Sequence, residues 1–338
     1  MFYFWRDHFL YPLSDFPGLL FFLISLVIVL VLPKFQKNTL TLIILSLLLG
    51  FSSYLSYNIR TTYIINIIFI FIYLFFKKVS IKNKAFIIFF MILGILIASI
   101  PQILVNLKNF NTFSILVNQS YRQQPFLIYA LRDGIKIQKY ETNIDLQTYP
   151  KNAVEFIDPI GKLINIDDIN SIIDYLKIFI KRPFDFLGIY FRHFFNGLDI
   201  MYPTVYVTNI FRLNKSFSLI NYTNWFIFIN FLYRNLKFQN NNFNFKITFL
   251  FSSLPILFIL PIYAEVRYYL PIYILSYGIV GYLISLKLYN IKKYIKKIIF
   301  ELKNKNVNFY NFIKIILLYF IFIITCFTLQ AYTYNSLL

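Results

Sequence analysis

Long apolar runs limit how this chain can fold more than any other feature. Hydrophobic residues make up 59% of its 338 residues and charged residues only 14%, whereas a soluble domain carries about 25% charged residues. The sequence therefore predicts an all-α, polytopic membrane protein of about eight transmembrane helices, because a helix needs roughly 20 apolar residues to cross a bilayer. The eight segments are Phe16–Pro33, Thr39–Tyr57, Thr61–Phe76, Ala85–Val105, Phe217–Tyr233, Ile247–Tyr263, Tyr268–Leu286 and Phe312–Tyr332.

The acidic residues divide the chain into three parts. Ten of its fourteen acidic residues lie between Asp133 and Asp199, in the one long stretch that has no segment of spanning length. We therefore predict an interfacial amino terminus and four transmembrane helices in residues 1–105, and a large water-facing loop in residues 106–216. Residues 217–338 are expected to hold four more helices and a lysine-rich connector.

Lysine and arginine residues predict how these helices are oriented. Sixteen of them lie in alternate connectors, whereas the opposite short connectors hold only Arg60 and Arg267. Because Lys-rich and Arg-rich connectors stay on the cytoplasmic side, we expect a multi-pass protein of the bacterial inner (plasma) membrane, with the 106–216 loop and the amino terminus outside. The net charge of +19 follows this pattern, so we do not expect nucleic-acid binding.

An external amino terminus leaves two interpretations open. Met1–Asp15 lacks the basic region of a signal peptide, and its aromatic residues suit a short helix at the membrane interface. The alternative is that a helix and an external loop belong before Met1, so that the sequence is truncated.

Two stripes of apolar residues with a helical period lie inside the large loop. They occupy Ile169–Ile180 and Phe184–Leu198, with Pro183 between them. We predict two amphipathic helices that lie nearly parallel to the membrane, with their apolar faces on the outer leaflet. The carboxylates of Asp167-Asp168 are expected to cap the first helix.

The preceding part of the loop, residues 119–166, shows no helical period. Irregular structure or short strands are expected there. Turns are predicted at Asp133-Gly134 and at Pro159-Ile160-Gly161, because Gly and Pro favour turn geometry.

An acid and a base stand close together in the run Glu265-Val-Arg267-Tyr-Tyr-Leu-Pro271, between the sixth and seventh apolar segments. Residues two apart do not face each other on a helix, so we expect Glu265 and Arg267 to contact other groups. Arg60 is the second outward arginine. We predict that the three residues face one polar cavity under the large loop, where guanidinium groups can bind a lipid-linked phosphate. The alternative is that each arginine is an independent interfacial anchor.

These motifs resemble those of a known family. Glu265-x-Arg267-Tyr-x-x-Pro271 resembles the E-x-R-[FY]-x-x-P element found late in GT-C type glycosyltransferases, which use polyprenyl-phosphate sugars. The segment from Lys181-Arg-Pro183 to Tyr202-Pro203 is similar to their outer-leaflet helix. The resemblance runs from about Tyr57 to Pro271 and implies a polyprenyl-phosphate donor bound by Arg267, Glu265 and Arg60. Its other parts are Pro101-Gln102, Asn106 and Tyr140-Glu141-Thr142, which are similar to a loop after a middle helix.

One part of the family's pattern is missing. GT-C enzymes carry an acidic catalytic or metal-binding residue in their first external loop, and the acids before the first apolar run here are Asp7 and Asp15. Asp7 is the candidate for a catalytic base, although no spacing supports it. Both acids also fit ordinary residues of the membrane interface.

The resulting hypothesis is a glycosyltransferase-like protein that moves a sugar from a polyprenyl-phosphate donor to an envelope glycan or lipid, and that is inactive alone if truncated. Two alternatives stay open: a polymerase or ligase of lipid-linked oligosaccharides, and a non-enzymatic membrane protein such as a transporter. With one cysteine, Cys326, and two histidines, we expect no zinc or thiolate centre. Carboxylates leave a divalent metal such as Mg²⁺ open as a cofactor.

Overall fold

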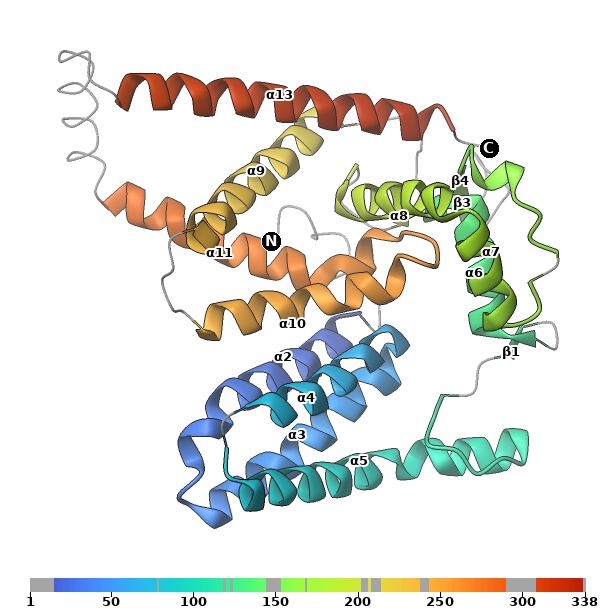
Figure 1. Cartoon of the computed structure of the whole chain (residues 1–338), viewed down its shortest axis with the longest axis vertical. Coiled ribbons are helices and arrows are strands. Elements are labelled where there is room, and N and C mark those ends of the chain that lie inside the picture. The colour runs from blue at the N-terminus through green and yellow to red at the C-terminus, as the bar shows by residue number, and fades with distance from the viewer. Residues whose placement is uncertain are drawn as a thin grey trace.

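The computed structural model describes residues 15–77, 79–117, 120–121, 124–143, 153–167, 169–201, 206–207, 214–237, 243–289 and 308–336. Within them the chain is mostly helical, and Figure 1 shows two groups of helices with a smaller mixed segment beside their ends. Each of the eight predicted apolar segments is largely helical. Five helical stretches are long and apolar enough to cross a membrane: Asp15–Phe35, Thr39–Ile59, Ile81–Phe110, Val266–Leu286 and Ile313–Tyr334.

The predicted number of eight spanning helices is therefore not confirmed. Two further stretches, Thr61–Phe76 and Asn244–Ile259, are apolar but shorter than the others. The helix α9, Lys215–Lys237, is long enough, but it carries asparagines at 221, 224 and 230 and is much less apolar.

The first group of helices is held by close backbone contact. It contains α2 (Asp15–Val31) with its extension η2 (Leu32–Phe35), α3 (Thr39–Ile59), η3 (Thr61–Tyr63), α4 (Ile64–Phe76) and α5 (Ile81–Phe110). The side chains of Asn38 and Ser80 cap α3 and α5. A Cβ atom at Gly50 would lie 1.9 Å from the carbonyl oxygen of Met91, so α3 and α5 cross where only a glycine fits, as small residues allow in membrane helices.

The second group follows the mixed segment. It contains α9, α10 (Phe243–Ile259), η5 (Val266–Tyr269), α11 (Leu270–Tyr289) and α13 (Asn308–Tyr334). The two groups share a core in which the ring of Phe22, from α2, packs against Phe251 of α10 at 4.8 Å and Tyr63 of η3 at 5.1 Å between centroids. This core joins the middle of α2 to the middle of α10 and to η3.

The mixed segment corrects the prediction that the fold is all-α. Its elements are β1 (Ser120–Tyr121), β2 (Gln124–Pro125), α6 (Phe126–Lys136), β3 (Ile137–Asn143), β4 (Ala153–Ile157), η4 (Gly161–Leu163), α7 (Ile172–Lys181), α8 (Pro183–Leu198) and β5 (Tyr206–Val207). β3 pairs antiparallel with β4 and parallel with β5, in the order β4-β3-β5. Short strands were expected in part of this region, but a sheet was not.

One of the two predicted turns is wrong. Asp133-Gly134 lies inside α6, where a Cβ atom on Gly134 would come within 2.4 Å of the carbonyl oxygen of Pro261. The glycine is therefore explained by close packing against the connector after α10 and not by a turn. The turn at Pro159-Ile160-Gly161 is confirmed, because its backbone leads directly into η4.

Both predicted amphipathic helices are present, as α7 and α8, but the cap of α7 differs. Ser171 caps α7 by accepting a hydrogen bond from the backbone of Asp174, so Asp167 is not the cap, and Asp168 lies outside the described residues. In Figure 1, α7 runs across the direction of α13, whereas α8 runs nearly along it. The orientation of the two helices relative to a membrane stays a prediction.

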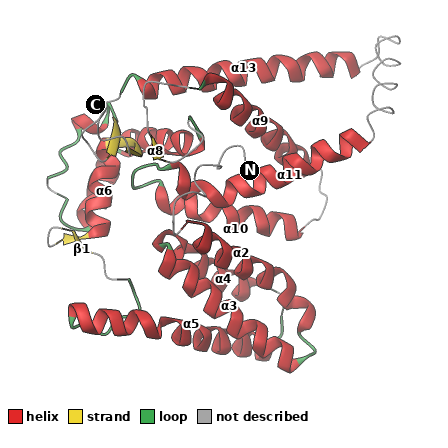
Figure 2. Ribbon diagram, turned by 180° about the vertical axis from the view of Figure 1, so that it is seen from behind, coloured by secondary structure: helices red, strands yellow, loops and turns green. Residues whose placement is uncertain are grey.

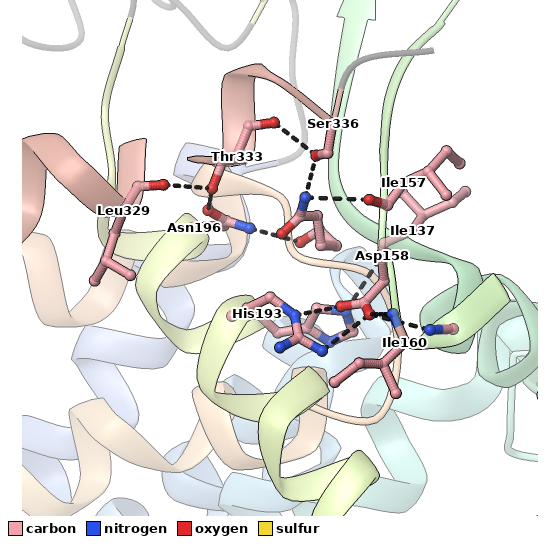
Figure 3. Close-up of polar contacts among 12 residues, drawn as sticks. Ile137, Ile157, Asp158, Ile160, His193, Asn196, Leu329, Thr333 and Ser336 are labelled. Carbon is pink, nitrogen blue, oxygen red and sulfur yellow. Dashed lines mark hydrogen bonds and ion pairs between the residues drawn. The ribbon is translucent and has the colours of Figure 1, made fainter. Parts of the chain in front are cut away.

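The helix α8 connects the mixed segment to the second group. Figure 3 shows Asn196 of α8 between the end of α13 and β3: it accepts a hydrogen bond from Thr333 Oγ1 at 2.9 Å and donates one to the carbonyl of Gln138 at 3.2 Å. The ring of His193 lies against the carbonyls of Leu260 at 2.7 Å and Ile137 at 3.0 Å. These buried contacts fix the mixed segment beside the ends of α10 and α13.

Candidate functional site

Four charged side chains meet where three elements end close together. Asp15 is the first residue of α2, Arg60 directly follows α3, and Glu265 and Arg267 lie between α10 and α11. Arg60 forms an ion pair with Asp15, and Nε of Arg267 lies 2.5 Å from Oε1 of Glu265. We call these four residues the paired-arginine site.

The local backbone explains why Glu265 and Arg267 pair with each other. Because residues two apart on a helix do not face each other, the sequence predicted that Glu265 and Arg267 would contact other groups. That prediction is wrong. Glu265 is extended, with φ −129° and ψ 126°, and Arg267 lies in the 3-10 turn η5 that follows. Because the chain passes from extended to turned between the two residues, their side chains can reach each other.

Tyr268 brings the two ion pairs into one site. The guanidinium carbon of Arg60 lies 5.1 Å from the centroid of the Tyr268 ring, and that of Arg267 lies 5.6 Å from it. A cation over an aromatic ring gains about 0.5–2 kcal/mol, depending on how far it is desolvated. Burial and then the charge of Arg267 lower the pKa of Arg60, and Tyr268 and Glu265 oppose this shift.

The acids and the arginines of the site differ in exposure. Asp15 and Glu265 are 2% and 1% exposed, whereas the side chains of Arg60 and Arg267 are 15% and 19% exposed. The carboxylates therefore lie behind the guanidinium groups and fix them from the protein side. The exposed side of each guanidinium, whose N–H donors form a planar fork, is where a further anion would bind.

The carboxylate of Glu265 accepts fewer hydrogen bonds than is usual for a buried carboxylate. Neither of its oxygens accepts a hydrogen bond within the described residues, although Oε1 is in ion-pair contact with Arg267. Most buried polar atoms in proteins are hydrogen-bonded, and exceptions gather at functional sites. The connector that carries Glu265 is thus a better candidate for function than for stability.

Several acidic and phenolic groups of the mixed segment lie near this connector. Burial, opposed by Lys139 and assisted by Glu265, raises the pKa of Glu141 on β3 to about 7. Burial and the neighbouring Glu155 raise the pKa of Asp133 on α6 to about 6. The ring of Tyr140, which follows Lys139 on β3, packs 5.1 Å from that of Tyr263. The mixed segment therefore gives the site one strongly acidic side.

Lys139 connects these acids to the second group of helices. It is fully buried, its Nζ lies 3.3 Å from Glu141 Oε1, and it donates a hydrogen bond of 2.9 Å to the carbonyl of Asp199. Asp199 in turn accepts hydrogen bonds from Tyr222 of α9 at 2.7 Å and Gln330 of α13 at 2.9 Å. This buried network fixes β3, and with it Glu141, against α9 and α13.

The structure brings together all three substrate-binding candidates named from the sequence, Arg60, Glu265 and Arg267. Asp7, the candidate base, lies outside the described residues. Asp15, which was interpreted as an ordinary residue of the membrane interface, is buried and paired with Arg60. Its position as the one acid directly before a strongly apolar run was a usable signal, since a carboxylate in that place needs a partner.

Metal ligands and known relatives add no further assignment. Within the part of the chain that the structure describes, no group of three or more His, Cys, Asp or Glu residues is placed to hold a metal ion. Comparisons with models of protein families, with curated proteins and with solved structures found no match.

Proposed function

We propose that the paired-arginine site binds the phosphate of a polyprenyl-phosphate sugar, and that the chain is a membrane glycosyltransferase-like protein acting on an envelope glycan or lipid. The observation that carries the proposal is the placement of Arg60 and Arg267, partly exposed, over one tyrosine ring with a buried acid behind each. Guanidinium groups bind phosphate bidentately, and two of them that face the same ring from partly exposed positions can bind one anion together.

The position of the site supports a lipid-linked substrate. Arg60 directly follows α3 and Arg267 opens the spanning stretch Val266–Leu286, so both guanidinium groups lie at ends of apolar helices. The phosphate of a polyprenyl lipid lies at the same level, where the acyl chains end and the headgroups begin. In the proposed transfer, an acceptor hydroxyl forms a bond to the anomeric carbon, its proton passes to a carboxylate base, and the lipid phosphate leaves with the charge that the arginines stabilise.

The ion pairs themselves favour a second candidate function. Each arginine has an acidic partner, so the four residues could serve only to join the ends of α2, α3 and α11 in a non-enzymatic membrane protein. A polymerase or ligase of lipid-linked oligosaccharides would use the same phosphate chemistry and differs from the first proposal in its acceptor. Binding of the phosphate separates both enzymatic proposals from the structural one.

The test compares a polyprenyl phosphate with the corresponding polyprenol. The purified chain in lipid nanodiscs is titrated with each ligand, and we expect the phosphate to bind more tightly. Arg267→Ala and Arg60→Ala should each weaken phosphate binding about tenfold to a hundredfold, because a charge-assisted hydrogen bond contributes about 1.5–3 kcal/mol. Arg267→Lys should restore part of it, since lysine keeps the charge but not the planar fork.

The matched control is Arg234→Ala, which removes an exposed arginine at the end of α9. It should leave binding of both ligands unchanged. Equal affinity for the phosphate and the alcohol, or phosphate binding that survives the loss of both site arginines, would favour the structural candidate.

A further inference from the structure

The helices α7 and α8 both carry large apolar side chains that are exposed. On α7 they recur at a helical period, and beyond Arg182 the same pattern resumes on α8. The residues are Ile173, Leu176, Ile180, Phe184, Leu187 and Phe191, each between 49% and 85% exposed. We call them the α7–α8 strip.

The strip is the outer face of two well-packed helices. On the opposite face, Tyr175 is 5% exposed and Phe186 is fully buried. The hydroxyl groups of Tyr175 and Tyr190 share a hydrogen bond of 2.7 Å that joins α7 to α8. The protein therefore covers one side of each helix and leaves large apolar side chains exposed on the other, as expected at a site of contact with a partner or a membrane.

The neighbours of α8 identify the bilayer as that contact. Phe195, one turn beyond Phe191, packs against a cluster formed by Tyr222 of α9 and by Ile323 and Cys326 of α13. Ile323 and Cys326 lie within the spanning stretch Ile313–Tyr334, and Figures 1 and 2 show α8 running along α13. The carboxyl-terminal half of α8 is thus at the depth of a membrane helix, where an outward apolar side chain meets lipid.

The polar residues of α7 suit a headgroup layer. Lys177 is 66% and Arg182 47% exposed at the side chain, and Lys181 is also exposed. These long side chains can extend to the phosphates while their methylene groups follow the apolar surface. Since α7 crosses the direction of the spanning helices and α8 follows it, the two helices differ in how they would meet the lipid.

We propose that the α7–α8 strip is a lipid-binding surface in which α7 lies on the leaflet and α8 enters it lengthwise beside α13. The bilayer is the occupant. A second copy of the chain, or a water-filled groove lined by the strip, are the competing outcomes. The proposal uses none of the residues of the paired-arginine site and stands without the proposed function.

The experiment places a fluorescent label at neighbouring positions on and off the strip. In a Cys326→Ala background, single variants Ile180→Cys and Phe184→Cys carry the label on the strip, and Lys181→Cys and Asp185→Cys carry it on the adjacent polar side. Each labelled chain is reconstituted in phosphatidylcholine nanodiscs at one copy per disc and, separately, at two copies per disc. Quenching is measured with lipids that carry a nitroxide on the acyl chain and, separately, with aqueous iodide.

We expect the lipid nitroxide to quench labels at 180 and 184 several-fold more strongly than iodide does, and the order to reverse at 181 and 185. A further label from Phe191→Cys should be quenched best by a nitroxide deep in the acyl chain, and one from Ile180→Cys by a nitroxide near the headgroup. Strong iodide quenching on the strip would overturn the proposal in favour of a water-filled groove. Protection from both quenchers would overturn it in favour of a covering protein surface, and equal depth at 180 and 191 would refute the lengthwise entry of α8.

Discussion

Two arginine–carboxylate pairs in this chain have almost the same burial and very different bonding. Arg192 and Asp158 are 17% and 0% exposed, and Arg267 and Glu265 are 19% and 1% exposed. Asp158 accepts two hydrogen bonds from Arg192, at 2.5 and 2.9 Å, and two more from the backbone of Ile160 and Gly161, as Figure 3 shows in part. Glu265 accepts none within the described residues and keeps one ion-pair contact.

The difference shows that burial alone does not determine whether an ion pair serves stability or ligand binding. A buried carboxylate with four donors is fully compensated for the loss of water, so the Arg192–Asp158 pair contributes to the fold. Glu265 is a buried carboxylate that holds its arginine in place by an ion pair, and the side chain of that arginine is 19% exposed on the other side. The first pair is expected to matter for stability and the second for binding.

The largest expected effect is at the fully bonded pair. Asp158→Asn removes the charge that Arg192 and two backbone N–H groups share, and losing one partner of a buried pair costs about 3–5 kcal/mol. Unfolding of the chain in detergent micelles, followed by circular dichroism, measures the change. The control is Asp185→Asn, whose exposed carboxylate lies 3.8 Å from Arg182 and should change stability by less than about 0.5 kcal/mol. Similar losses in both variants would remove the distinction between the pairs.

The next effect is a pH dependence at the acidic side of the site. Glu141 has a pKa of about 7 in the folded chain, against an ordinary value of 4.5. Between these values the folded state holds a proton that the unfolded state has released, so stability falls as pH rises from 4.5 to about 7. The expected fall is about 3 kcal/mol at most, because one pKa unit corresponds to about 1.4 kcal/mol. Glu141→Gln should remove this part of the fall and leave the smaller part that comes from Asp133, whereas Glu141→Asp should keep both, as measured by unfolding across this range.

A pH profile that is identical in the wild-type chain and Glu141→Gln would show that this carboxyl is not held neutral by burial. The acidic side of the site would then be less enclosed than its contacts indicate.

A smaller effect concerns the connector that carries Glu265 and Arg267. Gly134 of α6 packs against this connector, and a Cβ atom there would lie 2.4 Å from the carbonyl oxygen of Pro261. Gly134→Ala should therefore cost about 1–3 kcal/mol by overpacking and should also weaken phosphate binding, since it displaces the connector. Gly278→Ala is the control, because nothing lies within 4 Å of its Cβ position and alanine favours a helix by up to about 1 kcal/mol. A Gly134→Ala chain with full stability and binding would mean that the connector adapts freely.

The helices of this fold were predictable from the sequence, because the free energy of burying apolar runs in lipid dominates and is local. The site was predictable only in part. Arg60, Glu265 and Arg267 stood out because charges are rare in the opposite short connectors, but the burial of Asp15 depends on where α3 ends in space. The pairing of Glu265 with Arg267 depends on a change from extended backbone to a 3-10 turn, and no pattern of side chains in the sequence predicts that change.

The mixed segment was the least predictable part. Gly134 resembled a turn residue, yet it lies in a helix because a connector distant in sequence packs against it. Ser171 and not Asp167 caps α7, because the helix begins at Ile172, three residues after Ile169, the first apolar residue of the predicted stripe. The β4-β3-β5 sheet includes a parallel pairing between strands far apart in the chain, and such pairings depend on the tertiary fold.

The comparison between the two pairs is tested most directly by Arg267→Lys and Arg192→Lys, each measured for polyprenyl-phosphate binding and for unfolding in detergent. Both substitutions keep the charge and remove the planar fork, so they differ only in the pair that they change. We predict that Arg267→Lys weakens phosphate binding, though less than Arg267→Ala does, with little change in stability, and that Arg192→Lys loses stability while the folded chain still binds the phosphate. If both variants lose the same stability and neither changes binding, the paired-arginine site is structural and the proposed function is wrong.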